Sequence, residues 1–184
     1  MNIANILTLL RIMSPIFFCC ILFLEFELHI EKNIIFIFFI FFSLTDFFDG
    51  FLARKLNQVS TFGKIFDPIS DKVLTSSTLI YILTFEINIL IPAILIIARE
   101  FIVSGNREYM LKMKSKEINV IFLSKIKTTF QFLSISIYLA QDLLLQYYNV
   151  SIFALVCLWI ATILTIYTGI QYSYITFFSN RKRK

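Results

Sequence analysis

The stretch Asp46–Asp71 reads DFFDGFLARKLNQVSTFGKIFDPISD, and the rest of the chain is organised around it. It holds four aspartates, two glycines and one arginine, and apolar sequence long enough to cross a membrane lies on both sides. Carboxylates beside a bilayer are costly, and they are kept there mainly for function. The stretch is therefore a candidate functional site in a membrane setting.

The composition predicts a membrane protein. The chain has 184 residues, 58% hydrophobic and 16% charged, with a mean hydropathy of +0.81. Soluble domains are about 25% charged, and a domain of this size still exposes roughly 30% of its chain surface. A surface this apolar requires lipid. The net charge is +5, but the basic residues lie in short segments between apolar runs. This distribution argues against nucleic-acid binding.

Cysteine and histidine chemistry has little support. Cys19, Cys20 and Cys157 lie in apolar runs without metal-ligand spacing, so we interpret them as small buried hydrophobes. His29 is the only histidine and lies in a charged segment, which disfavours a nucleophile activated by histidine. The first residues lack a basic start and a cleavage site, so we expect them to be retained.

The apolar runs predict an all-α polytopic membrane protein with six transmembrane helices, forming a single domain over residues 1–184. A short amphipathic helix over residues 1–11 is expected to lie at the membrane interface. The third span is expected to start at Pro68, because proline suits the first turn of a helix. The expected spans are approximately 12–28, 34–54, 68–85, 89–110, 118–145 and 150–178.

The basic residues predict the orientation. Six spans place both termini on one side, together with the connectors after the second and fourth spans. That side collects Arg11, Lys55, Lys64, Lys112, Lys114, Lys116 and the tail 181–184, and the opposite side only Lys32. By the positive-inside rule, the termini and the acidic stretch face the cytoplasm.

The aspartates form two helically spaced pairs. Asp46 and Asp49 are at i and i+3, and Asp67 and Asp71 are at i and i+4, so each pair shares a helix face. Two antiparallel helices would bring the four mutually repelling carboxylates together. Divalent cations resolve the repulsion, and an all-oxygen set suits Mg²⁺ or Mn²⁺ rather than zinc. Such ions are suited to holding a pyrophosphate.

The small and basic residues between the pairs fit a phosphate ligand. Gly50 would let a ligand approach the helix, Gly63 could do the same in the loop, and Arg54 could clamp a phosphate. The alternative is that the aspartates form interfacial salt bridges with nearby cations. Those cations are Arg54, Lys55, Lys64, Lys72 and Arg99.

The pattern Asp46-x₂-Asp49-Gly50-x₂-Ala53-Arg54-x₈-Gly63-x₃-Asp67-x₃-Asp71 resembles the signature of the CDP-alcohol phosphotransferases at every position. The resemblance implies a six-helix membrane enzyme, usually a homodimer. It would cleave a CDP-linked pyrophosphate, transfer the phosphatidyl group to an alcohol and release CMP.

The same resemblance assigns roles to the residues of the stretch. It implies two metal ions, with Asp46, Asp49 and Asp67 as ligands. Asp71 would be both a ligand and the general base for the attacking hydroxyl. The residues expected to contact the CDP moiety are Asp46, Gly50, Ala53, Arg54 and Gly63.

Segments outside the stretch resemble bacterial members of the family whose donor is CDP-diacylglycerol and whose acceptor is sn-glycerol 3-phosphate. These segments are Asn5 to Arg11 with Leu7 and Thr8, Ala98-Arg99-Glu100, Arg107-Glu108 and Lys125-x-Lys127-Thr128-Thr129. They imply the bacterial cytoplasmic (inner) membrane. Three positions depart from that pattern: Ala4 where proline is expected, Ser124 where glycine is expected, and Gly105-Asn106 in place of a more apolar pair.

A dianionic acceptor needs a cationic pocket. Arg99, Arg107, Lys125 and Lys127 are the expected acceptor-phosphate residues, with pocket support from Asn5, Thr8 and Arg11. Two alternatives stay open. Lys125 or Lys127 could instead snorkel to headgroups, and Arg99 could pair internally with Glu100.

Other functions are weighed against this one. Within the family the acceptor could be inositol phosphate, serine or phosphatidylglycerol, and a basic pocket disfavours serine. A divalent-cation transporter would use the aspartates as a transit site, but such sites lie near the midplane and often accompany repeats. Here the acids lie at one face, and no repeat is visible. An inactive scaffold would have lost motif residues, and none is lost.

Overall fold

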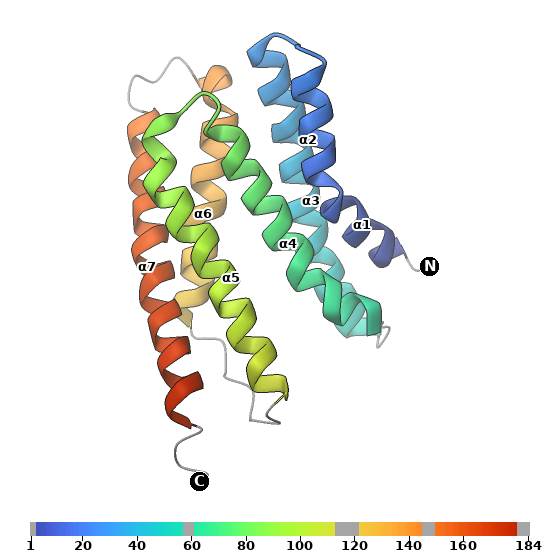
Figure 1. The fold of residues 1–184 in the computed structure, drawn as a ribbon. Helices are drawn as coiled ribbons and strands as arrows, with labels where there is room; N and C mark the ends of the chain where they lie inside the picture. Colours follow the sequence, from blue (N-terminus) through green and yellow to red (C-terminus); the bar gives the residue numbers. More distant parts are fainter. Residues whose placement is uncertain (1–2, 57–60, 113–121, 145–149, 180–184) are drawn as a thin grey trace. The chain divides into compact units, whose positions relative to one another are not determined.

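Every regular element in the described part of the chain is a helix (Figure 1). The computed structural model describes residues 3–56, 61–112, 122–144 and 150–179, with side chains within 5–45, 66–110, 123–143 and 150–176. The elements are α1 (Ile3–Ile12), α2 (Ser14–Phe23), α3 (Leu28–Leu56), α4 (Thr61–Ile82), η1 (Ile87–Ile89), α5 (Leu90–Lys112), α6 (Phe122–Leu139), η2 (Gln141–Leu144) and α7 (Val150–Ser179). The all-α prediction is confirmed over these residues.

The chain divides into two compact units. Unit 1 comprises Met1–Glu86 and Ser136–Tyr148, and unit 2 comprises Ile87–Ile135 and Asn149–Lys184. Unit 1 therefore contains α1 to α4, and unit 2 contains α5, α7 and most of α6.

In unit 1, α1 packs mainly against α4, and α2 packs against α4 and α3. The axes of α1 and α2 meet at a 47° bend, visible in Figure 1. Pro15 follows the bend in the first turn of α2, where its missing N–H costs nothing. Aromatic contacts join α2 to α3, with the rings of Phe17 and Phe38 stacked at 4.5 Å between centroids.

Within unit 1, an ion pair joins the start of α3 to η2. Lys32 Nζ lies 3.1 Å from Asp142 Oδ1 and 4.3 Å from the ring centroid of Phe85. The Lys32 side chain is buried, with 7% exposed. A buried lysine is tolerated here because a carboxylate and an aromatic face both stabilise its charge.

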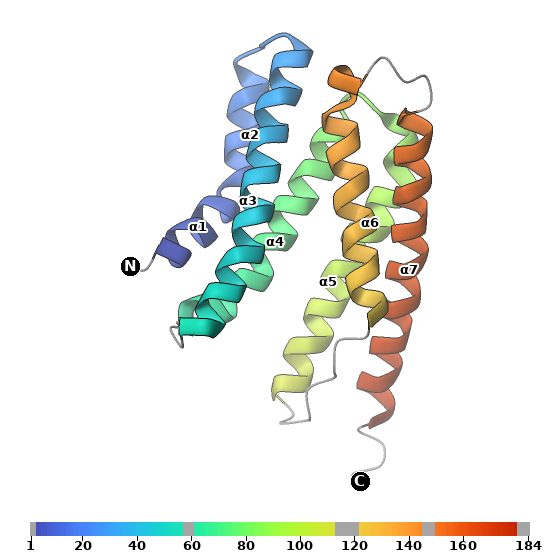
Figure 2. The same cartoon turned by 180° about the vertical axis from the view of Figure 1, so that it is seen from behind.

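In unit 2, α5 and α7 pack along each other (Figure 2). Ala93 of α5 and Ala154 and Ala161 of α7 are fully buried, and such small residues let helix axes approach closely. The hydroxyl of Ser134 on α6 donates to the carbonyl oxygen of Ala154 at 2.7 Å, which joins α6 to α7.

The helix bounds differ from the expected span bounds at three places. The run 12–28 is not one helix, since α1 ends at Ile12 and α2 at Phe23. Helix α3 already starts at Leu28, six residues before the expected span start at 34, so His29, Glu31 and Lys32 lie in its first turns. Helix α4 starts at Thr61 with Pro68 inside it, so Gly63 is helical and not in a loop. Pro68 was expected in the first turn of a helix, where its missing N–H is not needed. Inside α4 it instead removes one backbone hydrogen bond.

Three helical segments of the described chain are long and apolar enough to cross a membrane: Leu28–Thr45, Ile87–Met110 and Val150–Thr176. The bent pair of α1 and α2 makes a fourth if it forms one span. Large apolar side chains on these segments face outward, as lipid contact requires, including Ile37, Phe101 and Ile163 at 67%, 71% and 62% exposure. These apolar helices indicate a membrane protein. The total of six transmembrane helices stays a prediction.

Candidate active site

Helix α1 buries its polar side against α4. Thr8 and Arg11 are each 1% exposed, whereas Ile6 and Leu10 on the other side are each 46% exposed. The apolar face expected of this helix is therefore the outer one, and the polar face contacts protein. Its position at a membrane interface stays a prediction.

The partners of these two polar side chains are the two aspartates of α4. Thr8 Oγ1 donates a hydrogen bond to Asp67 Oδ1 at 2.6 Å, and Arg11 Nη1 donates to Asp71 Oδ1 at 2.8 Å. Thr8 and Arg11 are one turn apart on α1, and the aspartates are one turn apart on α4. The predicted shared face of Asp67 and Asp71 is thus seen directly, because one neighbouring helix contacts both.

These contacts restrict both carboxylates from one side. An ion pair with a guanidinium at 2.8 Å is a charge-assisted hydrogen bond, which is stronger and more directional than a neutral one. Arg11 is buried, but 48% of the Asp71 side chain stays exposed. Asp71 is therefore oriented by protein and still open to a substrate. Asp71 is paired with Arg11, a cation that was not among those considered for interfacial salt bridges.

The remaining residues of the acidic stretch are located only at the level of the backbone. Asp46, Asp49, Gly50, Ala53 and Arg54 lie on the last part of α3, and Gly63 lies in the first turn of α4. Their side chains are outside the described set. The meeting of the two aspartate pairs and the contacts to CDP therefore stay predictions.

The described part of this site fits a hard divalent cation. Asp67 and Asp71 supply carboxylate oxygens one turn apart, which is the donor type that Mg²⁺ and Mn²⁺ prefer. Among the described side chains, no three histidines, cysteines or acids group together as metal ligands. The α4 pair would thus supply part of a ligand set, with Asp46 and Asp49 as the expected remainder.

A second polar cluster lies in unit 2, around Glu100 of α5. Its Oε1 accepts hydrogen bonds from Arg99 Nη1 at 2.9 Å and from Lys127 Nζ at 2.6 Å. The side chains of Arg99, Glu100 and Lys127 are 11%, 18% and 5% exposed. The internal Arg99–Glu100 pair left open above is thus present, and it includes Lys127. Two cations on one carboxylate leave a net positive charge, as an anion site requires.

The other two predicted acceptor residues are not part of this cluster. Arg107 and Lys125 are exposed, and neither forms an ion pair with any described side chain. Of the predicted four, the structure therefore brings together Arg99 and Lys127 only.

Helix α7 supplies contacts that the sequence analysis missed. Arg99 Nε donates to the backbone oxygen of Thr165 at 3.1 Å, and Nη2 donates to Thr168 Oγ1 at 3.0 Å. A signal was available, because small and polar residues recur at helical spacing within the apolar α7 run. They are Thr162, Thr165, Thr168, Gly169, Ser173 and Thr176.

One departure from the family pattern also acquires a structural explanation. Asn106 Nδ2 donates to Ser173 Oγ at 2.8 Å. A polar residue at position 106 therefore joins α5 to the same polar row of α7.

Comparison with known proteins places the chain among lipid-synthesising transferases. The family model for CDP-alcohol phosphatidyltransferase matches residues 1–167. Relatives named CDP-diacylglycerol–glycerol-3-phosphate 3-phosphatidyltransferase are similar over nearly the full length. The protein from Rickettsia felis is 39% identical over 173 residues, covering 93% of both chains. The protein from Wigglesworthia glossinidia brevipalpis is 37% identical, and the match covers 95% of this chain and 94% of the relative. The protein from Haemophilus influenzae is 39% identical, and the match covers 93% of this chain and 91% of the relative.

Proposed function

The chain belongs to the CDP-alcohol phosphatidyltransferase family, and we propose that it is a phosphatidylglycerophosphate synthase. It would transfer the phosphatidyl group of CDP-diacylglycerol to sn-glycerol 3-phosphate, giving phosphatidylglycerophosphate and CMP for phosphatidylglycerol synthesis. Relatives with this activity in their names, 37–40% identical over most of the chain, support the acceptor.

The observation that carries the chemistry is the orientation of Asp71 by Arg11. A general base must be held within hydrogen-bond reach of the proton that it removes. Asp71 is held by a buried guanidinium at 2.8 Å and is nearly half exposed. It would take the proton of the acceptor hydroxyl while that oxygen bonds to the lipid-linked phosphorus. The bond from this phosphorus to the oxygen of CMP breaks, and CMP leaves.

Asp46, Asp49, Asp67 and Asp71 are the residues proposed to hold two Mg²⁺ or Mn²⁺ ions. When bound, the ions would neutralise charge on the pyrophosphate as its bond breaks. Thr8 fixes the Asp67 carboxylate through its hydroxyl. Asp46, Gly50, Ala53, Arg54 and Gly63 are proposed to contact the CDP moiety; their motif spacing supports this.

The acceptor phosphate is proposed to bind the cluster of Arg99 and Lys127, with Arg107 and Lys125 as further cations. The buried location of the first two strengthens their attraction for a phosphate, because little water screens them. Asn5 belongs to the proposed pocket support with Thr8 and Arg11, on the basis of its place on α1.

The wider setting follows from the same proposal. We expect a homodimer in the bacterial cytoplasmic membrane, with six spans and with both termini and the active site facing the cytoplasm. The distribution of Lys and Arg supports this orientation. Cysteine labelling from each side of sealed vesicles tests the orientation, and mass measurement in detergent tests the dimer.

The decisive experiment follows CMP release by the purified protein. The reaction contains CDP-diacylglycerol, Mg²⁺ and one alcohol at a time: glycerol 3-phosphate, inositol phosphate, serine or phosphatidylglycerol. We expect release with glycerol 3-phosphate alone. Release with another alcohol would change the acceptor, and metal flux into proteoliposomes without CMP release would indicate a transporter instead.

A further inference from the structure

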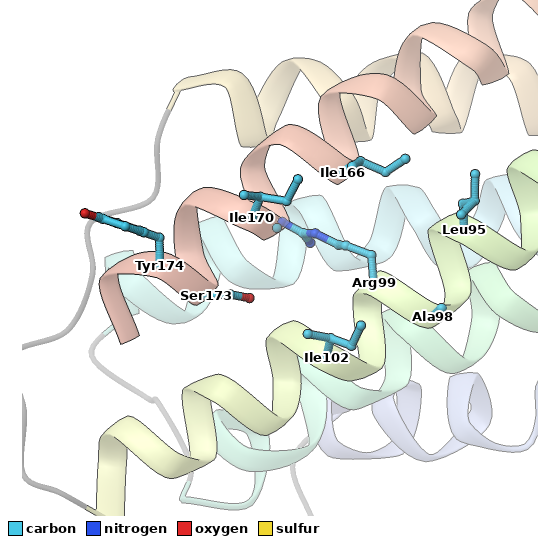
Figure 3. Close-up of a pocket in the computed structure, with 9 residues that line it drawn as sticks. Leu95, Ala98, Arg99, Ile102, Ile166, Ile170, Ser173 and Tyr174 are labelled. Carbon is cyan, nitrogen blue, oxygen red and sulfur yellow. The ribbon is translucent and has the colours of Figure 1, made fainter. Parts of the chain in front are cut away.

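The stem of Arg99 lies directly against Gly169 of α7. A Cβ atom added at Gly169 would lie 2.8 Å from Cγ, 3.2 Å from Nε and 3.6 Å from Cδ of Arg99. Contacts under 3.0 Å essentially do not occur for real Cβ atoms. In Figure 3, Arg99 extends from α5 towards α7 at a groove of about 440 Å³. Position 169 therefore accommodates this arginine only because it has no side chain.

The far end of Arg99 is held at three points. Its Nε and Nη2 donate to the Thr165 carbonyl oxygen and to Thr168 Oγ1, and its Nη1 donates to Glu100. The atom that the added Cβ would approach most closely, Arg99 Cγ, is only two bonds from the backbone Cα. A shift of the stem would therefore move the guanidinium away from these acceptors, and a rotamer change at the tip alone would not relieve the contact.

We propose that Gly169, together with Thr165 and Thr168, positions Arg99 for binding of the acceptor phosphate. Because Arg99 and Lys127 share Glu100 Oε1, the position of Arg99 also bears on that of the Lys127 ammonium. Gly169 is a positioning residue that touches no substrate. The inference rests on the proposed function. It adds to the acceptor site a residue beyond position 167, where the family match ends.

A packing role for Gly169 is the competing explanation. Small residues commonly allow two helix backbones to approach. However, the three heavy atoms nearest to the added Cβ all belong to the Arg99 side chain and none to the α5 backbone. The positioning role therefore predicts that a side chain at 169 is harmful only when arginine occupies position 99.

Gly105 provides a matched control on the partner helix. It lies inside α5, and an added Cβ there meets nothing within 4 Å. Gly169→Ala and Gly105→Ala thus make the same chemical change and the same gain in helix propensity. They differ only in what the new methyl group meets.

The kinetic test measures CMP release against the concentration of each substrate. Gly169→Ala should raise the KM for glycerol 3-phosphate about tenfold or more, as expected for a weakened charge-assisted contact. The KM for CDP-diacylglycerol should stay within about twofold, and Gly105→Ala should change neither value. Thr168→Val, which removes one acceptor without adding bulk, should shift the same KM in the same direction. It also serves if Gly169→Ala does not fold.

A thermal-unfolding cycle tests the positioning separately from the activity. Gly169→Ala should lower the unfolding temperature in the wild-type background and leave it unchanged or raised in an Arg99→Ala background. Equal losses in both backgrounds would show backbone packing and overturn the inference. An unchanged KM for glycerol 3-phosphate in both Gly169→Ala and Thr168→Val would also overturn it, with the proposed function intact. If the wild type releases no CMP with glycerol 3-phosphate, the proposed function fails, and the cycle still decides the role of Gly169.

Discussion

Replacing Arg11 by methionine tests whether α1 orients the catalytic base. The substitution keeps most of the apolar stem, which is buried in α1, and removes the guanidinium that donates to Asp71 Oδ1 at 2.8 Å. Asp71 keeps its carboxylate but loses a charge-assisted hydrogen bond that helps to fix its direction. We therefore expect a loss in kcat that is smaller than the loss caused by removing the base itself.

The magnitude follows from the type of bond that is lost. A hydrogen bond to a charged group contributes about 1.5–3 kcal/mol, and each 1.36 kcal/mol corresponds to about tenfold in rate. Arg11→Met should thus lower kcat by about 10- to 150-fold. The upper limit is the whole contribution of a general base, about 10²- to 10⁴-fold.

Lys32→Met is the matched control, because it removes another buried cation paired with an aspartate of unit 1. Position 32 precedes Asp46 by 14 residues (46 − 32) in α3, which is about 21 Å along the helix. Both variants should lose about 1–3 kcal/mol of stability, since each removes a buried cation that is hydrogen-bonded to a partly hydrated carboxylate. Only Arg11→Met should lower kcat.

The assay combines CMP release at saturating substrates with thermal unfolding in the same detergent, so that kcat is expressed per folded enzyme. If Arg11→Met and Lys32→Met had the same kcat, the orienting role of Arg11 would be refuted, whatever their stabilities.

Three further predictions concern the same site. Asp71→Asn should lower kcat by about 10²- to 10⁴-fold and should also lower the unfolding temperature, because it removes the anion paired with the buried Arg11 guanidinium; near-normal turnover in detergent would remove Asp71 as the base. Thr8→Val should raise the Mg²⁺ concentration for half-maximal activity about 10- to 100-fold, as loss of a hydrogen bond to a metal ligand does. Ser77→Ala is its control, since the Ser77 hydroxyl bonds to the Val73 carbonyl oxygen within α4, and an equal shift there would contradict the role of Thr8. Chelation should abolish CMP release and added Mg²⁺ or Mn²⁺ should restore it, whereas full activity in excess chelator would exclude the proposed metal site.

The sequence alone was sufficient for the features that depend on local order. Composition indicated the membrane, and the helical period of 3.6 placed Asp67 and Asp71 on one face of a helix. The motif spacing identified the family, which the match over residues 1–167 confirms. These inferences succeed because periodicity and spacing are properties of neighbouring residues.

Boundaries were less predictable, because helix ends respond to context. Pro68 is a good start signal in isolation, but α4 begins at Thr61 and includes it. Helices α1 and α2 pack against α4 and stabilise it. Packing of this kind can offset the one backbone hydrogen bond that the proline removes.

Only the tertiary structure could show which partners the charged residues select. Arg11 and Asp71 are 60 residues apart, and Arg99 and Thr168 are 69 apart, so no local pattern relates them. Arg99 and Lys127 were predicted to bind the acceptor phosphate from the sequence. Their shared carboxylate and the need for glycine at 169 follow from how α5, α6 and α7 pack. A buried charge must find a partner or acceptor within about 3 Å, and the packed fold determines which group lies at that distance.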